Sequence, residues 1–168
     1  QKAVVRAGAD VLVHTVQNEV IDDELMGLLR EKKPYWTTVI GLGDRSEACD
    51  GDAFVDAPYP ASTLHEIREK DCAPRPAEAN ANRERILATN MPKYLAAGAR
   101  LVLGTDAGID ARHAFGWADH HELSRWVQSG VPAAEAIVAA TSRAAELLGA
   151  TDLGSLAAAK SAPPSCWP

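Results

Sequence analysis

The sequence lacks the features of several specialised protein classes. It has no hydrophobic run long enough to span a membrane and no cluster of lysine and arginine. A nucleic-acid surface needs a concentrated basic face to neutralise phosphates, so a formal net charge of −6 argues against nucleic-acid partners. Small neutral or cationic substrates fit this charge better. With 46% hydrophobic and 24% charged residues, the composition predicts a globular chain with neither nucleic-acid nor membrane partners.

Cysteine is also scarce. The three cysteines, Cys49, Cys72 and Cys166, are odd in number and widely spaced. They form neither a Cys-x-x-Cys metal knuckle nor an evident disulfide framework, so the sequence predicts free thiols. At 168 residues, the chain can bury about 70% of its unfolded surface as one compact domain.

The most informative stretch is RLVLGTDAGI, in which an apolar run ends in a potential metal ligand. Leu101 to Leu103 contain no polar residue, which is typical of a parallel strand covered on both faces. Gly104 and Gly108 allow a tight turn, so that Asp106 can point into the open end of the sheet. The alternative is that Asp106 caps the following helix or closes an Asx turn.

A second short apolar run, DVLVHTV, ends in His14. Alone, such a histidine is more often a core residue than a ligand. An imidazole and a carboxylate at the mouths of neighbouring parallel strands, however, form half of a typical site for Zn²⁺, Mn²⁺ or Fe²⁺. The pairing of His14 with Asp106, and the alternation of elements between them, favours the metal site.

The rest of the pattern alternates strands and helices. The acidic start of residues 22–33 suits a helix N-terminus, residues 35–40 are β-branched and aromatic enough for a strand, and Pro92 lies inside the helical pattern of residues 77–97. The expected helices are 1–8, 22–33, 62–70, 77–97 and two after Trp117, and the expected strands follow Asp10, Pro34 and Arg100. Ser62 or Thr63 is the expected cap of the short helix.

Residues 41–60 are expected to form a long acidic loop, either solvated or acting as a lid over the strand mouths. A calcium loop is rejected because Phe54 stands where an oxygen ligand is required. The start GLGDRS is only a weak match to a phosphate-binding glycine loop, since Ser46 replaces the third glycine.

The order DVLVHTV, DDELMGLLREKK, YWTTVI, LVLGTDAGI and HHELSRWVQSGVPAAEAIVAATSRAAELLG resembles the C-terminal half of the amidohydrolase superfamily, closest to its imidazolonepropionase-like and prolidase-like branch. The resemblance covers about residues 1–162. Its specific parts are Gly104-Thr105-Asp106 and the helix junction at residues 129–136. It implies an α/β fold, the C-terminal portion of a (β/α)₈ TIM-like barrel with about three parallel strands and flanking helices. Residues 1–150 would hold strands six to eight, and residues 151–168 a remnant of a β-sandwich segment and an irregular tail.

The resemblance also implies a chemistry. Asp106 would bind the more buried ion and take a proton from the hydrolytic water, whose pKa the metal lowers. His14 would bind a second metal or contact the substrate or the attacking water. Both residues would be catalytic and metal-binding, with one or two divalent ions, Zn²⁺ foremost. The reaction would be hydrolysis of a C–N bond in an amide, cyclic amide or peptide-like substrate.

The chain departs from the family pattern at several places. The His-x-His of the first strand, the lysine of the fourth and the histidine of the fifth have no counterpart, so we expect a fragment that is inactive alone. His65 is expected at the surface. His113, His120 and His121 either line the substrate mouth or lie at the surface or in a helix cap. The tail SAPPSCWP replaces the family's hydrophobic strand.

A second hypothesis is a non-catalytic α/β half-barrel that pairs with another chain, including a second copy in a homo-oligomer. Unpaired edge strands in a half-barrel favour such association. No signal peptide is visible, and a cytoplasmic location is the default expectation.

Overall fold

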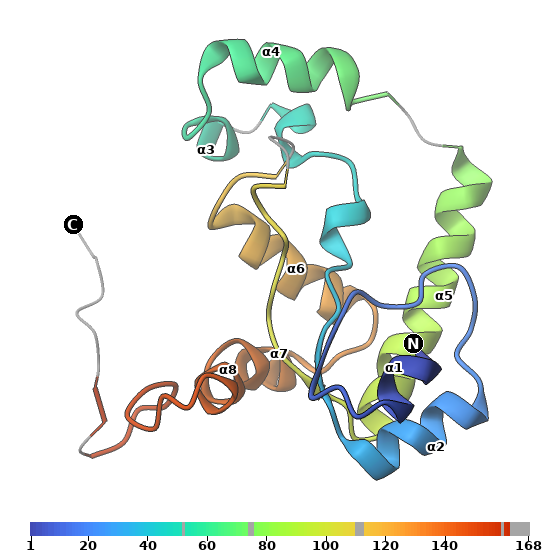
Figure 1. Cartoon of the computed structure of the whole chain (residues 1–168). Coiled ribbons are helices and arrows are strands. Elements are labelled where there is room, and N and C mark those ends of the chain that lie inside the picture. The colour runs from blue at the N-terminus through green and yellow to red at the C-terminus, as the bar shows by residue number, and fades with distance from the viewer. Residues whose placement is uncertain (52, 74–75, 110–112, 159, 162–168) are drawn as a thin grey trace.

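A computed structural model describes residues 1–51, 53–73, 76–109, 113–158 and 160–161 (Figure 1). Its centre is a parallel sheet of three strands, β1 (Val11–Val13), β2 (Tyr35–Thr37) and β3 (Arg100–Leu101), in the order β1-β2-β3. Helices follow each strand, as parallel connections require. The predicted mixed α/β fold with three parallel strands and flanking helices is confirmed. Each strand is shorter than the apolar run that predicted it.

The helices agree with most of the sequence pattern. Asp22 caps α2 by accepting a hydrogen bond from Leu25 N (3.0 Å), which fixes the predicted helix start. Pro92 lies inside α5 without ending it. No helix in the described part of the chain is long and apolar enough to cross a bilayer. The helices are α1 (Lys2–Arg6), α2 (Asp23–Lys32), α3 (Ala53–Asp56), α4 (Ala61–Lys70), α5 (Ala77–Ala96), α6 (Trp117–Gln128), α7 (Ala133–Ala140) and α8 (Ser142–Leu147).

Three sequence predictions about these elements are wrong. Residues 41–60 are not one loop, because they form the 3₁₀ turns η1 (Gly41–Gly43) and η2 (Glu47–Asp50) and the helix α3. Helix α4 begins after Pro60 and has no side-chain cap, so neither Ser62 nor Thr63 caps it. The last predicted helix divides at Thr141, whose hydroxyl donates to the Ile137 carbonyl (2.7 Å) and whose backbone leaves the helical region.

The core lies on one face of the sheet. Leu12, Trp36 and Leu101 are adjacent in register and buried, and they pack against side chains of α2 and α5. On the opposite face Val11 and Val13 remain 41% and 53% exposed. In the third apolar run the successive residues Leu101 and Val102 are both buried, but Arg100 of β3 and Leu103 are only half-buried. Strand β1 is buried on one face only.

The end of the described chain forms turns. The backbone N–H of Ser161 donates to the Asp152 carbonyl (2.8 Å), which brings these two described residues together. The predicted irregular tail from residue 162 onward lies outside the described residues.

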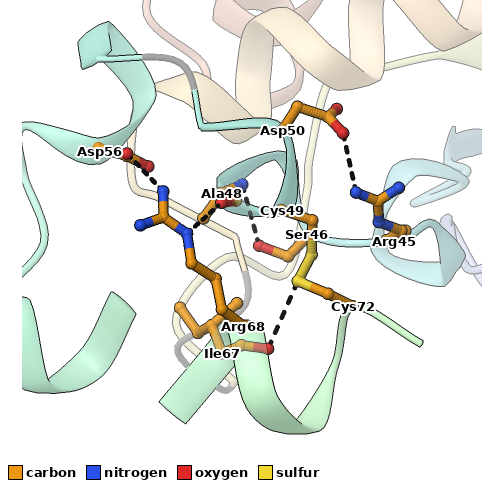
Figure 2. The surroundings of a disulfide bond; sticks show 9 residues. All are labelled: Arg45, Ser46, Ala48, Cys49, Asp50, Asp56, Ile67, Arg68 and Cys72. Atoms are coloured by element: carbon orange, nitrogen blue, oxygen red, sulfur yellow. Dashed lines mark hydrogen bonds and ion pairs between the residues drawn. A yellow bond between two sulfur atoms is a disulfide. The ribbon is translucent and has the colours of Figure 1, made fainter. Parts of the chain in front are cut away.

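A disulfide joins Cys49 in η2 to Cys72 after α4, with a Cα–Cα distance of 5.5 Å (Figure 2). The prediction of free thiols is therefore wrong for these two residues, and Cys166 lies outside the described part of the chain. Sequence spacing could not show the pairing, because the intervening α3 and α4 bring the two cysteines together. Arg68 on α4 adds to this connection, which we call the Cys49–Cys72 clasp, by donating to the Ala48 carbonyl (3.0 Å) and to Asp56.

Breaking the disulfide will destabilise the fold. It closes a loop between cysteines 23 residues apart, and a loop of this size contributes about 3 kcal/mol by restricting the unfolded chain. The double variant Cys49→Ser/Cys72→Ser should lose about that much unfolding free energy in a denaturant titration. Reductant should lower the midpoint of the wild type and leave the double variant unchanged. An equal response of both proteins to reductant would contradict the pairing.

Candidate functional site

His14 and Asp106 lie together at the carboxyl edge of the sheet. His14 directly follows β1, and Asp106 lies five residues after the end of β3. The imidazole Nε2 is 3.3 Å from the carboxylate Oδ2, and the two side chains are 56% and 35% exposed. The pairing spans the whole sheet, because β2 lies between the two strands. The structure thus brings together the two residues that the sequence singled out.

The backbone is strained after every strand of the sheet. His14, Val39 and Asp106 have φ angles of 63°, 52° and 54°. This left-handed region is uncommon outside glycine, and for a β-branched residue such as Val39 it is a genuine outlier. Such strain gathers at functional sites and persists only where neighbouring contacts enforce it.

The backbone of His14 is held from three sides. Its N–H donates to the Thr37 carbonyl on β2 (2.9 Å). Its carbonyl accepts from the Trp36 indole (2.9 Å) and from the Gln1 amide (2.9 Å). These bonds fix the left-handed conformation and direct the imidazole toward Asp106.

Two hydrogen bonds from neighbouring residues close the turn that carries Asp106. The Thr105 hydroxyl accepts from Ala107 N (3.2 Å), while Ile109 N donates to the Asp106 carbonyl (3.2 Å). Gly104 is required before this turn because a Cβ there would collide with Thr37 Cγ2. Among the described residues, the partner of the Asp106 carboxylate is His14. This pairing takes the place of the helix cap or Asx turn that the sequence left open.

The pair does not extend to a larger cluster. Within the described ranges, no group of three or more His, Cys, Asp or Glu side chains is placed to hold a metal ion. His14 and Asp106 thus supply one nitrogen and one oxygen donor.

The remaining histidines occupy different environments. His65 is exposed on α4 beside Glu69 (3.4 Å), as predicted. His113 is buried, and the His120 ring lies 6.1 Å from the Trp117 ring. His121 contacts Asp44 through Nε2 (2.9 Å), which places it in an ionic network.

Asp44 is the centre of that network, which the sequence did not predict. Its carboxylate lies 2.6 Å from Arg83 Nη1 and 2.7 Å from Arg125 Nε. Arg125 Nη2 also donates to both carboxylate oxygens of Glu84 (2.7 Å each). These partners come from α5 and α6, so no local motif marks them. The network joins the chain after β2 to both helices.

The charge of Asp44 is stabilised by these partners. Burial raises the pKa of the Asp44 carboxyl, but the His121 hydrogen bond and the charges of Arg125 and Arg83 outweigh that effect. The net pKa lies below its ordinary value of 3.8. Asp44 is therefore a structural anion, held ionised by two cations.

Removing this charge will weaken the fold in a pH-dependent way. Because the folded-state pKa is lowered, Asp44 contributes stability that is fully present above its ordinary pKa of 3.8 and is lost as pH falls through the folded-state pKa. Asp44→Asn should cost on the order of 2 kcal/mol at pH 7. The difference from wild type in urea unfolding should shrink below pH 3.8. Asp50→Asn, which disrupts an exposed pair with Arg45 (2.8 Å), is the control and should have almost no effect. A constant difference across pH would contradict the assignment.

Neither the known protein-family models nor the curated proteins contain a match to this chain. The likeness to the amidohydrolase superfamily thus remains a prediction from sequence motifs, and the function is inferred from the geometry of the site.

Proposed function

We propose that this chain is the C-terminal, metal-binding part of an amidohydrolase-type enzyme that hydrolyses C–N bonds of an amide, cyclic amide or peptide-like substrate. The observation that carries the proposal is the approach of His14 to Asp106 across a parallel sheet, at 3.3 Å. In barrels of parallel strands the active site lies at this carboxyl edge. The TIM-like barrel itself is part of the proposal.

The donor set fits a divalent metal. Two ligands of a tetrahedral zinc ion, each about 2.1 Å from it, lie about 3.4 Å apart, and His14 Nε2 and Asp106 Oδ2 are 3.3 Å apart. Imidazole nitrogen and carboxylate oxygen are also the ligand types that zinc accepts. By resemblance, further ligands belong to earlier strands of the barrel.

A simple ion pair accounts less well for the arrangement. A surface ion pair contributes about 0–1 kcal/mol, whereas each residue held in a sparsely populated backbone region costs on the order of 1–3 kcal/mol. His14, Val39 and Asp106 all have such backbones. The pair His65 and Glu69 makes a similar contact on an ordinary helix without strain of this kind. The strain at the sheet edge therefore favours a functional role for His14 and Asp106.

The two side chains would divide the chemistry. A bound divalent ion supplies Lewis acidity, which lowers the pKa of water toward neutrality. The Asp106 carboxylate would accept the proton from the attacking water and later return it to the leaving nitrogen. The His14 imidazole would hold the ion through Nε2, and an ion held there would supply the positive charge that stabilises the negative charge developing on the substrate oxygen.

Zinc titration of the chain tests the proposal. Zn²⁺ should shift the imidazole resonances of His14 in NMR spectra, with binding measured in parallel by calorimetry. Both His14→Ala and Asp106→Ala should weaken binding at least about tenfold, because each removes one of the two donors. His65→Ala is the matched control and should retain wild-type affinity, since His65 belongs to an exposed helical pair.

If Asp106→Ala binds zinc as the wild type does, or if His65 responds as strongly as His14, the pair is an ordinary ion pair. The metal-dependent hydrolase proposal then fails.

The open face of the sheet favours a second candidate, a non-catalytic half-barrel that associates with another chain. Val11 and Val13 are exposed on strand β1, which is an edge of the sheet as far as the described residues show. An exposed apolar edge strand promotes pairing between chains.

This candidate predicts association that depends on concentration. Sedimentation should show oligomers of the wild type that Val13→Lys shifts toward monomer, because a charge on the edge strand opposes pairing. The control Val127→Lys changes a comparably exposed valine on α6 and should leave association unchanged. A wild type that stays monomeric at every concentration would remove the candidate.

A further inference from the structure

We infer that Glu122 is a positioning residue that sets the placement of His14 and Asp106 through the middle strand of the sheet. The inference rests on the proposed function, because it assigns Glu122 to the geometry of that metal-binding pair. Glu122 lies on α6 and contacts neither member of the pair directly. Its effect passes through the segment 38–41, which follows β2.

The Glu122 carboxylate is buried and surrounded by donors. Glu122 is only 1% exposed. Oε1 accepts from Ile40 N (2.9 Å), Thr38 Oγ1 (3.0 Å) and Trp126 Nε1 (2.8 Å), and Oε2 accepts from Gly41 N (2.6 Å). Every partner that the described residues give to Glu122 is thus a donor, and three of the four lie in segment 38–41.

Such a set of donors is needed to hold a carboxylate at this depth. Burial raises the pKa of Glu122, and the N–H groups of Gly41 and Ile40, the Trp126 indole and the Thr38 hydroxyl act against that effect. A side-chain amide of the same shape would turn an N–H₂ group toward one of these donors. Glutamine at position 122 therefore cannot accept hydrogen bonds from all four donors.

The bonds from Glu122 enclose the strained residue of the segment. Val39, at φ 52°, lies between Thr38 and Ile40, and Glu122 binds both of these neighbours. A left-handed valine persists only if its surroundings enforce the conformation. Gly41 permits the close approach of α6, because a Cβ there would lie 3.0 Å from Glu122 Oε2 and 2.8 Å from His121 Cδ2.

The end of β2 touches both strands that carry the candidate site. The carbonyls of Thr37 and Thr38 accept from His14 N (2.9 Å) and Thr15 N (3.1 Å). On the other side, Thr37 Cγ2 fills the space that a side chain at Gly104 would need, two residues before Asp106. A displacement of segment 38–41 would therefore move β1 and the Asp106 turn relative to each other.

The variant Glu122→Gln tests this coupling. In the metal-free protein it should shift the backbone amide resonances of His14 and Gly104, which are in different elements from Glu122. It should also weaken Zn²⁺ binding about tenfold, as loss of an outer supporting contact does in metal sites. The double variant Cys49→Ser/Cys72→Ser is the control for stability, because it weakens the fold within residues 49–72 without removing a bond to segment 38–41. It should leave both readouts unchanged.

A milder variant covers the case in which Glu122→Gln does not fold. Thr38→Val removes one hydroxyl from the network at nearly constant shape and should change both readouts in the same direction by a smaller amount. Unshifted His14 and Gly104 resonances in a folded variant would overturn the inference. If the wild type binds zinc, a folded variant with unchanged zinc affinity would also overturn the inference.

The two proposals fail in different ways. A wild type that binds no Zn²⁺ at His14 refutes the proposed function. Shifted amide resonances in the metal-free Glu122→Gln protein would still support the positioning of His14 by Glu122.

Discussion

The hydrogen bond from the Trp36 indole to the His14 carbonyl (2.9 Å) connects the core to the candidate site. Trp36 is fully buried and its ring lies 4.4 Å from that of Tyr94. The Tyr94 hydroxyl in turn lies 2.9 Å from the Thr15 hydroxyl and accepts from Val16 N (3.3 Å). The chain leaving β1 is thus fixed by two large aromatic residues whose positions depend on core packing. A strained backbone at His14 persists here because many core contacts oppose its relaxation.

Helix α6 has a role that its sequence did not suggest. The sequence predicts a helix here, and its histidines are candidates for the substrate mouth. In the structure His121 and Arg125 bind Asp44, and Glu122 binds the backbone of residues 38–41. The polar side chains of α6 therefore attach the end of β2 to the rest of the fold. In the described part of the chain, these contacts support the candidate site without including a residue that touches His14 or Asp106.

The sequence predicted features that depend on local pattern or on the direction of strands. Asp22 marked the start of α2, and the two apolar runs ending in His14 and Asp106 placed both residues at one edge, because parallel strands end together. The Cys49–Cys72 bond, the Asp44 network and the Glu122 contacts were not predictable in this way. Each joins residues from separate elements, and such pairings leave no periodic trace in one sequence.

The Cys49–Cys72 clasp also bears on how this fold can vary. The bond, with the Arg68 contacts to Ala48 and Asp56, lies wholly within the excursion between β2 and α5 (Figure 2). In Figure 1, α3 and α4 of this excursion lie at the opposite end of the molecule from α1 and α2. Because the disulfide joins two residues of the same excursion, changes of length between Cys49 and Cys72 need not disturb the register of the sheet. The part between Cys49 and Cys72 can therefore vary in length while residues 38–44, which α5 and α6 hold, keep the end of β2 in place.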